Sequence, residues 1–357
     1  MKEGLTLQQM AEEITRQNEL KEDYLVDTRN LKMETCGDQV YLHMYDNGTE
    51  PVEPLEIGAI AHRQFGAHLN IPASYYDKML TEYPSLLTQN VNAWLERTPS
   101  TRMLRTMGGT ARAFLSRRYK RIDNMEVATA VLPILSEIKG ARFESCQITE
   151  SRMYMKVVNE RLTAEVSPGD IVQAGIIISN SETGMGAVNI QPLVYRLVCR
   201  NGMIVNDART RRNHVGRANE ADENFMLYSE QTLAADDKAF LLKIQDTVKA
   251  VVEETRFSQV VGLMQAAKGA AMDTHDIPGI VRLTSKDFKI TENESTGVLQ
   301  HLIEGKDLTL YGLSNAITRY SQDVESYDRA TELESIGYNV LTMPAAQWKR
   351  INNQAAA

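Results

Sequence analysis

The chain has 357 residues, of which 43% are hydrophobic and 24% are charged. This length and composition are those of a globular protein with about two domains, and they exclude a wholly disordered or fibrous chain. The net charge of −8 by itself argues against a nucleic-acid-binding protein, because such binding depends on neutralising phosphates.

The N-terminal third begins with residues 5–35, which we expect to form an amphipathic helical opening because Leu7, Met10, Ile14 and Leu20 recur at helical spacing. A short strand pair at residues 39–43 and 55–57 should flank the turn at 46–48. Helices are predicted over residues 57–69, from Pro72 onward, and over residues 85–96.

The central segment changes to alternating strand patterns. We predict a strand over residues 111–119, a helix over 125–138, paired strands at 141–149 and 152–158, and two longer strands. These longer strands, at 175–179 and 187–199, bracket a loop that contains Gly184 and Gly186. The loop is predicted to be a hairpin tip, and a lone GxG is only a weak signal for phosphate binding.

After Gly216 the composition favours acidic helices, at residues 223–256, 260–272, 292–304 and 308–333. We therefore expect an α+β fold: a central antiparallel sheet with helices packed on one face, plus a mostly helical C-terminal part. The expected divisions are an N-terminal helix and short hairpin (1–56), an α+β core with a basic strand and loop (57–217), an acidic helical part (218–341) and a tail (342–357).

Positive charge is concentrated in two windows of this acidic chain. Residues 97–121 hold eight basic residues and no acidic one, and residues 196–217 hold six basic residues against Asp207. The remainder of the chain must therefore be strongly negative, so the molecule is electrically polarised.

The first basic window predicts a surface that holds nucleic acid. On a strand, alternate side chains share a face, so arginines lie beside aromatic rings, as in proteins that grip phosphate and stack on bases. We expect phosphate contacts from Arg112, Arg117, Arg118, Lys120 and Arg121, and base stacking by Phe114 or Tyr119. The alternative is a half-buried strand whose arginines pair with acidic neighbours from the C-terminal helices.

The second window contains Arg209, Arg211 and Arg212, which would close over a bound strand as phosphate-binding forks. A solvated or interface loop is the alternative. If the two windows lie on one surface they reinforce each other, and on opposite faces they do not.

The sequence contains none of the common catalytic or metal-binding motifs. Cys36, Cys146 and Cys199 are far apart and the six histidines lack metal-ligand spacing, so we expect reduced thiols, no metal and no cofactor. The chain start lacks the apolar core of a secretory signal, and no window approaches 18 apolar residues. A cytoplasmic protein without membrane contact is expected.

Four segments carry a resemblance to a known family: RAFLSRRYKRIDN (112–124), GIIISNSETGMGAVNIQPLVYRLVCRNGMI (175–204), RRNHVGR (211–217) and LTLYGLSNAITRYSQDVESYDRATELE (308–334). Together they resemble the domain of unknown function 932 family over residues 57–341. The resemblance implies a protein of phages, plasmids or integrated elements. At the level of fold alone, the order of strand, helix and meander is also similar to Rad52-like single-strand annealing proteins.

These observations predict a protein that binds single-stranded DNA or RNA, with annealing as one form of that activity, and that assembles into a homo-oligomer. An enzyme acting on a phosphorylated or nucleotide substrate is one alternative, with Asp123, Glu182 or His214 as acid–base groups. The other is an oligomeric structural or host-interaction protein that does not contact nucleic acid.

Overall fold

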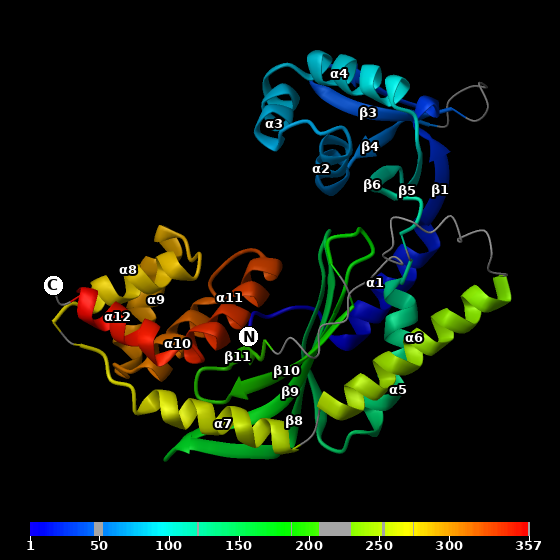
Figure 1. Cartoon of the computed structure of the whole chain (residues 1–357). Coiled ribbons are helices and arrows are strands. Elements are labelled where there is room, and N and C mark those ends of the chain that lie inside the picture. The colour runs from blue at the N-terminus through cyan, green and yellow to red at the C-terminus, as the bar shows by residue number, and fades with distance from the viewer. Residues whose placement is uncertain are drawn as a thin grey trace.

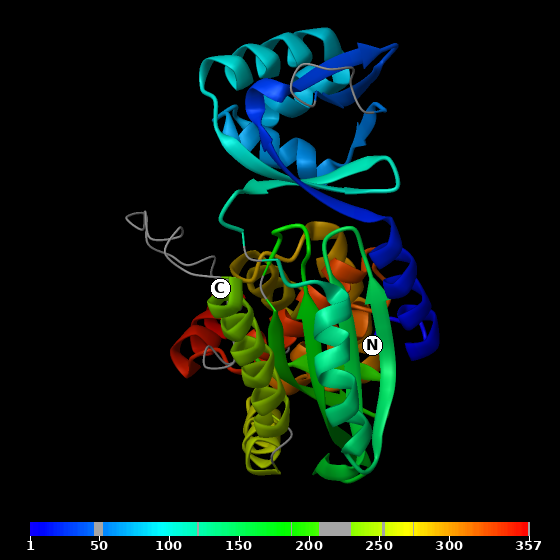
Figure 2. The ribbon, with the colours of Figure 1, turned by 90° about the vertical axis from the view of Figure 1, so that its right-hand side faces the viewer.

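The computed structural model describes residues 1–45, 53–119, 121–186, 188–206, 230–251, 254–273 and 275–355. It confirms an α+β fold with a helical C-terminal part, built here around two separate sheets (Figure 1). One sheet belongs to a lobe formed by residues 21–119, and the rest of the molecule is called the body. Helix α1 (Leu7–Leu20) before this lobe and helix α5 (Asn124–Glu137) after it both pack in the body, so we call the lobe the inserted lobe. Figure 2 shows the inserted lobe standing above the body.

The body contains an antiparallel sheet of five strands in the order β11-β10-β9-β8-β7. Consecutive strands are neighbours, so the predicted meander is present. The strands are β7 (Ala141–Ile148), β8 (Met153–Ser167), β9 (Asp170–Asn180), β10 (Asn189–Arg196) and β11 (Asn201–Ile204).

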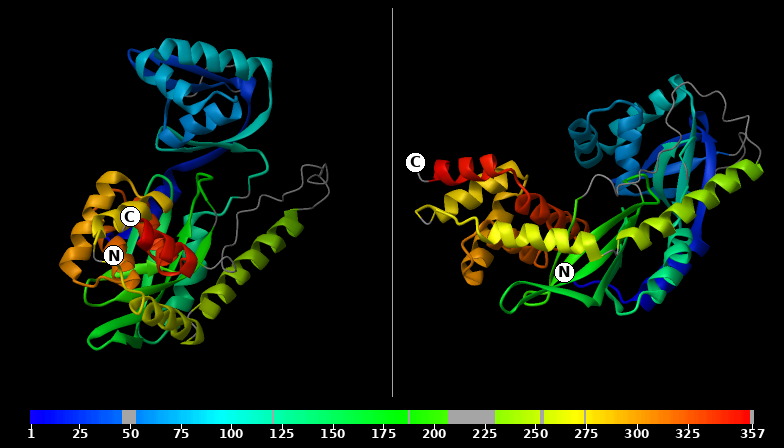
Figure 3. Two further views of the ribbon diagram at one scale, coloured as in Figure 1. Left: turned by 60° about the vertical axis from the view of Figure 1, so that its left-hand side comes forward. Right: turned by 60° about the horizontal axis from the view of Figure 1, so that its bottom comes forward.

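Helices cover both faces of this sheet, not the single face expected. Side chains alternate along a strand, so neighbouring residues of β8 face opposite sides of the sheet. Met153 and Met155 pack with α1, α5 and α6 (Glu230–Val251) on one side. Tyr154 packs toward Tyr327 of α11 (Tyr327–Leu341) on the other side. The C-terminal helices gather on the side opposite α5 and α6 (Figure 3).

The C-terminal helices share one hydrophobic core with the ends of β8–β11. They are α7 (Glu254–Lys268), α8 (Ile277–Asp287), α9 (Glu292–Gly305), α10 (Leu310–Tyr320), α11 (Tyr327–Leu341) and α12 (Ala345–Ala355). The segment expected to be a tail thus contains α12, whose Trp348 and Ile351 are buried in this core. A fully buried ion pair, Lys156 of β8 with Glu334 of α11 at 2.7 Å, joins the sheet to these helices. None of the helices in the described parts of the chain is long and apolar enough to span a membrane.

The inserted lobe has a mixed sheet in the order β1-β5-β6-β4-β3-β2, in which only β4 and β6 run parallel. Its strands are β1 (Lys21–Asp27), β2 (Leu31–Cys36), β3 (Gln39–Met44), β4 (Leu55–Ile57), β5 (Thr101–Met107) and β6 (Thr110–Ser116), with a 3-10 turn, η1 (Thr28–Asn30), after β1. Its helices are α2 (Ala59–His68), α3 (Ala73–Glu82) and α4 (Pro84–Arg97).

The edge of this sheet at β2 is closed by a side chain of α4. The Asn92 amide accepts a hydrogen bond from the Met33 N–H at 2.7 Å and donates one to the Met33 carbonyl at 2.8 Å. Asn92 thus takes the place of a neighbouring strand at the sheet edge.

Two expectations for the N-terminal third are corrected by this lobe. The helix expected over residues 5–35 ends at Leu20, because the next seven residues pair along their full length with β5. A boundary after residue 56 would cut through the six-stranded sheet, since Glu56 and Ile57 pair with β6. Pairing with distant strands, not local helical spacing, decides both positions.

Candidate functional site

The junction between lobe and body is held by buried ions. The guanidinium of Arg105 on β5, only 1% exposed, pairs with Asp23 of β1 at 2.6 Å and with Asp123 at the start of α5 at 2.8 Å. Lys21 of β1 also reaches Asp123, at 2.7 Å. Three segments that are distant in the sequence are therefore fastened by charge.

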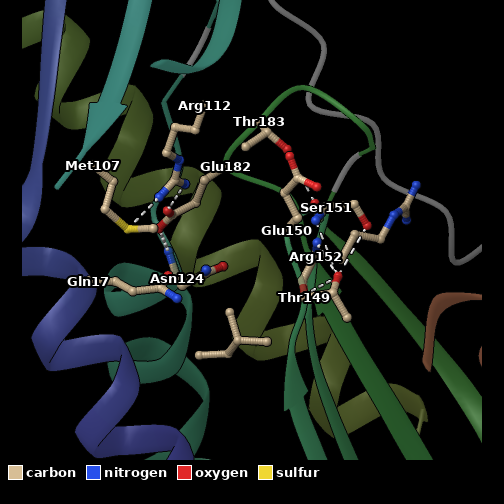
Figure 4. Close-up of a pocket in the computed structure, with 11 residues that line it drawn as sticks. Gln17, Met107, Arg112, Asn124, Thr149, Glu150, Ser151, Arg152, Glu182 and Thr183 are labelled. Atoms are coloured by element: carbon tan, nitrogen blue, oxygen red, sulfur yellow. Dashed lines mark hydrogen bonds and ion pairs between the residues drawn. The ribbon is translucent and has the colours of Figure 1, made fainter. Parts of the chain in front are cut away.

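Glu182 extends this network from the β9–β10 loop. Its buried carboxylate accepts a hydrogen bond from the Asn124 N–H at 2.7 Å and pairs with Arg112 of β6 and, at 3.5 Å, with Lys21. Figure 4 shows the Arg112 guanidinium pointing toward Glu182 and Met107. The positive charge of β6 is thus neutralised within the same chain.

Two members of the network, Asp123 and Arg105, are held in their charged forms. Burial would raise the pKa of Asp123, but Arg105 and Lys21 outweigh it and hold the pKa below its usual value. Burial likewise opposes the charge of Arg105, and its bonds to Asp23 and Asp123 more than compensate, which raises its pKa. Groups that stay charged around neutral pH are suited to fixing the junction and poorly suited to proton transfer.

The loop with two glycines lies beneath the inserted lobe. Gln64 of α2 donates to the Thr183 carbonyl at 2.8 Å, and the Tyr119 hydroxyl donates to the Ser181 carbonyl at 3.0 Å. Gly184 has φ +78°, and a Cβ there would lie 2.5 Å from Leu115 Cδ2, so glycine is required for this contact. The predicted hairpin tip is the β9–β10 connection, and it packs against the lobe.

A cleft of about 670 Å³ opens beside this loop, between α2 of the lobe, the sheet of the body and α11. Arg63 lies on the α2 side and Arg152 on the β7–β8 turn. Its floor consists largely of hydroxyl and amide side chains from the sheet, and α11 contributes further polar groups; these lining residues are Ser179, Asn189, Gln191, Asn206, Thr331 and Ser335. These groups offer hydrogen bonds on the sheet and α11 sides of the cavity, and apolar residues such as Ile60 and Ile177 complete the lining.

A smaller cavity of about 280 Å³ adjoins the cleft and shares Glu150, Ser151 and Arg152 with it (Figure 4). It ends at the Arg112–Glu182 ion pair, so the junction network forms the inner wall of the combined site.

The β7–β8 turn is fixed at both ends. Asp328 in the first turn of α11 accepts hydrogen bonds from the hydroxyls of Thr149 at 3.0 Å and Ser151 at 2.6 Å. The Arg152 guanidinium donates to the Met185 carbonyl and lies against Gly186, where a Cβ would come within 2.3 Å of Nη2. The absence of a side chain at Gly186 therefore lets Arg152 reach the cleft.

The residues predicted to contact nucleic acid fall into four groups. Arg112 and Phe114 are buried: Phe114 is stacked on Phe65 at 4.0 Å and covered on its ring by Arg102, so it has no free face for a base. Arg117 and Arg118 are exposed, and their guanidinium groups have no partner in the described chain, whereas the exposed Arg121 lies 3.3 Å from Asp23. Tyr119 is half-buried on Ser181. Lys120, Arg209, Arg211 and Arg212 lie outside the described residues.

Two cleft arginines were missed by the sequence reasoning. Arg63 sits alone on a helix and Arg152 alone in a turn, so no charge run marks either position. Arg63 is exposed and has no polar partner among the described residues. Only the packing of lobe on body brings these two side chains to one cavity.

The fold and site define a two-lobed α+β protein with a polar cleft at an ion-paired junction. The chain belongs to the family described as Domain of unknown function (DUF932), whose model matches residues 113–348. The match begins within the last strand of the inserted lobe and extends into α12. Neither a curated protein nor a solved structure matches the chain.

Proposed function

We propose that the protein binds single-stranded nucleic acid, with the phosphate backbone at the rim of the cleft and a base inside it. The observation that carries the proposal is that two arginines lining the cleft, Arg63 and Arg152, and two exposed arginines beside Tyr119, Arg117 and Arg118, form no ion pair with a described acid. Guanidinium forks match the oxygens of a phosphate, and a bound polyanion would supply the charge that these side chains lack.

The placement of the four arginines supports a shared ligand. Arg63 and Arg152 line the cleft itself. Arg117 and Arg118 directly precede Tyr119, which bonds to Ser181 at one end of the loop whose Met185 lines the same cleft. In the sequence, Asn206 on the cleft floor is followed closely by Arg209, Arg211 and Arg212, which add positive charge to this part of the chain.

The acidic residues of the cleft are already engaged within the protein. Asp328 is bonded to Ser151, and Glu332 pairs with Arg329 at 2.6 Å. Glu150 lies against the start of α2: its Oε1 is 3.2 Å from the position that a Cβ on Gly58, the N-cap residue, would occupy. The N-terminus of a helix favours negative charge. Of these three acids only Glu332 has a counter-charge among the described residues, so the arginines must outweigh Asp328 and Glu150 to hold a phosphate.

A single strand fits this cleft better than a duplex. A cavity of about 670 Å³ admits an unstacked base, and its amide and hydroxyl lining matches the polar edges of bases. In a duplex the pairing edge of each base is hydrogen-bonded to the opposite base, so it could not bond to the side chains of the cleft. The family resemblance extends the proposal to a role in phage or plasmid replication or recombination, and assembly into a homo-oligomer remains part of it.

The test is fluorescence anisotropy with a labelled single-stranded oligonucleotide between 50 and 200 mM salt. Four phosphate contacts on a single strand give a log–log slope of about −2.8, so affinity should fall by roughly 50-fold over this range. The double variant Arg63→Met/Arg152→Met should flatten the slope by about 1.4. The control is Arg16→Met/Arg29→Met, which removes two surface arginines that pair with Glu13 and Asp27.

Absence of binding at 50 mM salt, or binding that does not respond to salt, would overturn the proposal. Equal slopes for the cleft variant and the control would remove the cleft from it.

A further inference from the structure

The cleft floor contains an oriented chain of side-chain amides. Asn189 and Gln191 lie on the same face of β10, and Asn189 is directly opposite Ser179 of β9. Asn189 Nδ2 donates to Gln191 Oε1 at 2.7 Å, and Gln191 Nε2 donates to Asn206 Oδ1 at 3.0 Å. Asn206 Nδ2 then donates to Asn339 Oδ1 of α11 at 3.3 Å.

Every amide in this chain donates in the same direction, away from Asn189. The chain therefore begins at the carbonyl oxygen of Asn189, which accepts nothing. Asn189 Oδ1 is shielded from bulk solvent and has no hydrogen-bond partner within the described structure. Rotating the Asn189 amide alone would place its oxygen against the oxygen of Gln191. Rotating Gln191 as well would place the Gln191 oxygen against the Val205 carbonyl, which accepts from Gln191 Nε2 at 3.4 Å.

A second unsatisfied oxygen lies on the cleft wall. Thr331 Oγ1 of α11 is shielded and has no partner among the described residues. Buried polar groups in folded proteins normally have a partner, and an amide oxygen such as Asn189 Oδ1 can only accept, so this cavity suits a ligand that supplies a hydrogen-bond donor.

We propose that this cavity recognises the exocyclic amino group of a nucleobase, and so prefers bases that carry one, such as cytosine, over uracil and thymine. This inference rests on the proposed function. An amino group supplies the N–H donor that Asn189 Oδ1 lacks, and its second N–H can bond to another acceptor of the cleft lining. A carbonyl oxygen in the same position would face the Asn189 oxygen and leave it unpaired.

Cytosine and uracil make the sharpest comparison, because they differ only at the 4-amino or 4-oxo group and in the protonation of N3. Anisotropy titrations with oligo-deoxycytidine and oligo-deoxyuridine of equal length at fixed salt should show about tenfold tighter binding of the cytidine oligomer. Asn189→Ala should reduce this ratio to near one. Thr296→Val, which changes an exposed threonine of α9 bonded only within its own helix, should keep the ratio.

A second measurement needs no protein variant. Oligomers of N4,N4-dimethylcytosine retain the ring but have no N–H at position 4, so the wild-type protein should bind them no better than the uridine oligomer. Equal, salt-dependent binding of all three oligomers would overturn this inference and leave the proposed function standing. Failure to bind any of them would overturn the proposed function and this inference with it.

Discussion

The Lys156–Glu334 pair should respond very differently to single and double substitution. Both side chains are 0% exposed and 2.7 Å apart, and the Lys156 ammonium also lies 4.6 Å from the centre of the Tyr327 ring. At an effective dielectric constant near 20 the two charges attract by about 6 kcal/mol, which offsets the cost of removing them from water. Lys156→Met alone leaves the Glu334 carboxylate buried without its ion-pair partner.

We therefore expect Lys156→Met to lower the free energy of unfolding by about 3–5 kcal/mol. Lys156→Met/Glu334→Leu should cost less than about 1 kcal/mol, or stabilise, because two apolar side chains then fill the site. The matched control is Lys78→Met, which breaks an exposed pair with Glu82 and should cost under about 0.5 kcal/mol.

The assay is urea unfolding followed by tryptophan fluorescence. In a Trp94→Phe background, Trp348 of α12 is the sole tryptophan. It lies in the hydrophobic core that α11 shares with the strands of the body, so its fluorescence reports the unfolding of that core. A loss below 1 kcal/mol for Lys156→Met would refute the reasoning, as would a double variant that is as unstable as the single one.

Three further predictions concern other parts of the fold. Gly184→Ala should lower the melting temperature more than Gly37→Ala, because both have positive φ but only Gly184 has a close neighbour; equal losses would contradict the contact with Leu115. Hydrogen bonds from Arg329 lower the pKa of Glu294 to about 2, so the stability lost in Glu294→Gln should be largest at neutral pH and vanish as pH falls from about 4.5 toward 2. Urea midpoints across pH check this, and a difference independent of pH would count against it. Asn92→Ala should cost about 1–2 kcal/mol and speed exchange of the Met33 amide; unchanged protection there would show that Asn92 does not close the sheet edge.

The body was predictable from sequence to a greater extent than the lobe. The predicted boundaries agree within one residue with the structure for β7, for α5 and for the start of β8, which were predicted at 141–149, 125–138 and 152–158. Among these elements, only the C-terminal extension of β8 beyond residue 158 was not predicted. Their apolar spacing reflects burial against one another, which a local pattern records. In contrast, β1 begins with Lys21, Glu22 and Asp23, and such a charged run does not suggest a paired strand.

The candidate site could be predicted only in part, because ion pairing is a tertiary property. The window at residues 97–121 contains no acid, yet Arg105 and Arg112 find theirs at Asp23 and Glu182, far away in the sequence. The alternative of a half-buried strand paired with distant acids therefore describes Arg112 of the predicted strand, although its partner Glu182 lies in the β9–β10 loop and not in the C-terminal helices. Arg117 and Arg118, just beyond the strand, keep the exposure that the sequence suggested.

The inserted lobe also has a consequence for how the chain folds during synthesis. Lys21 and Asp123, at the two ends of the insertion, are 2.7 Å apart, so the lobe leaves and re-enters the body at one point. Helix α1 leaves the ribosome before the lobe, but its packing partners on α5 and β7 follow only after the entire lobe. Because domains generally fold as units during translation, the lobe can form its own core while the apolar face of α1 is still without its partners. A helix synthesised before the lobe can therefore pack in the body only after the lobe has been synthesised.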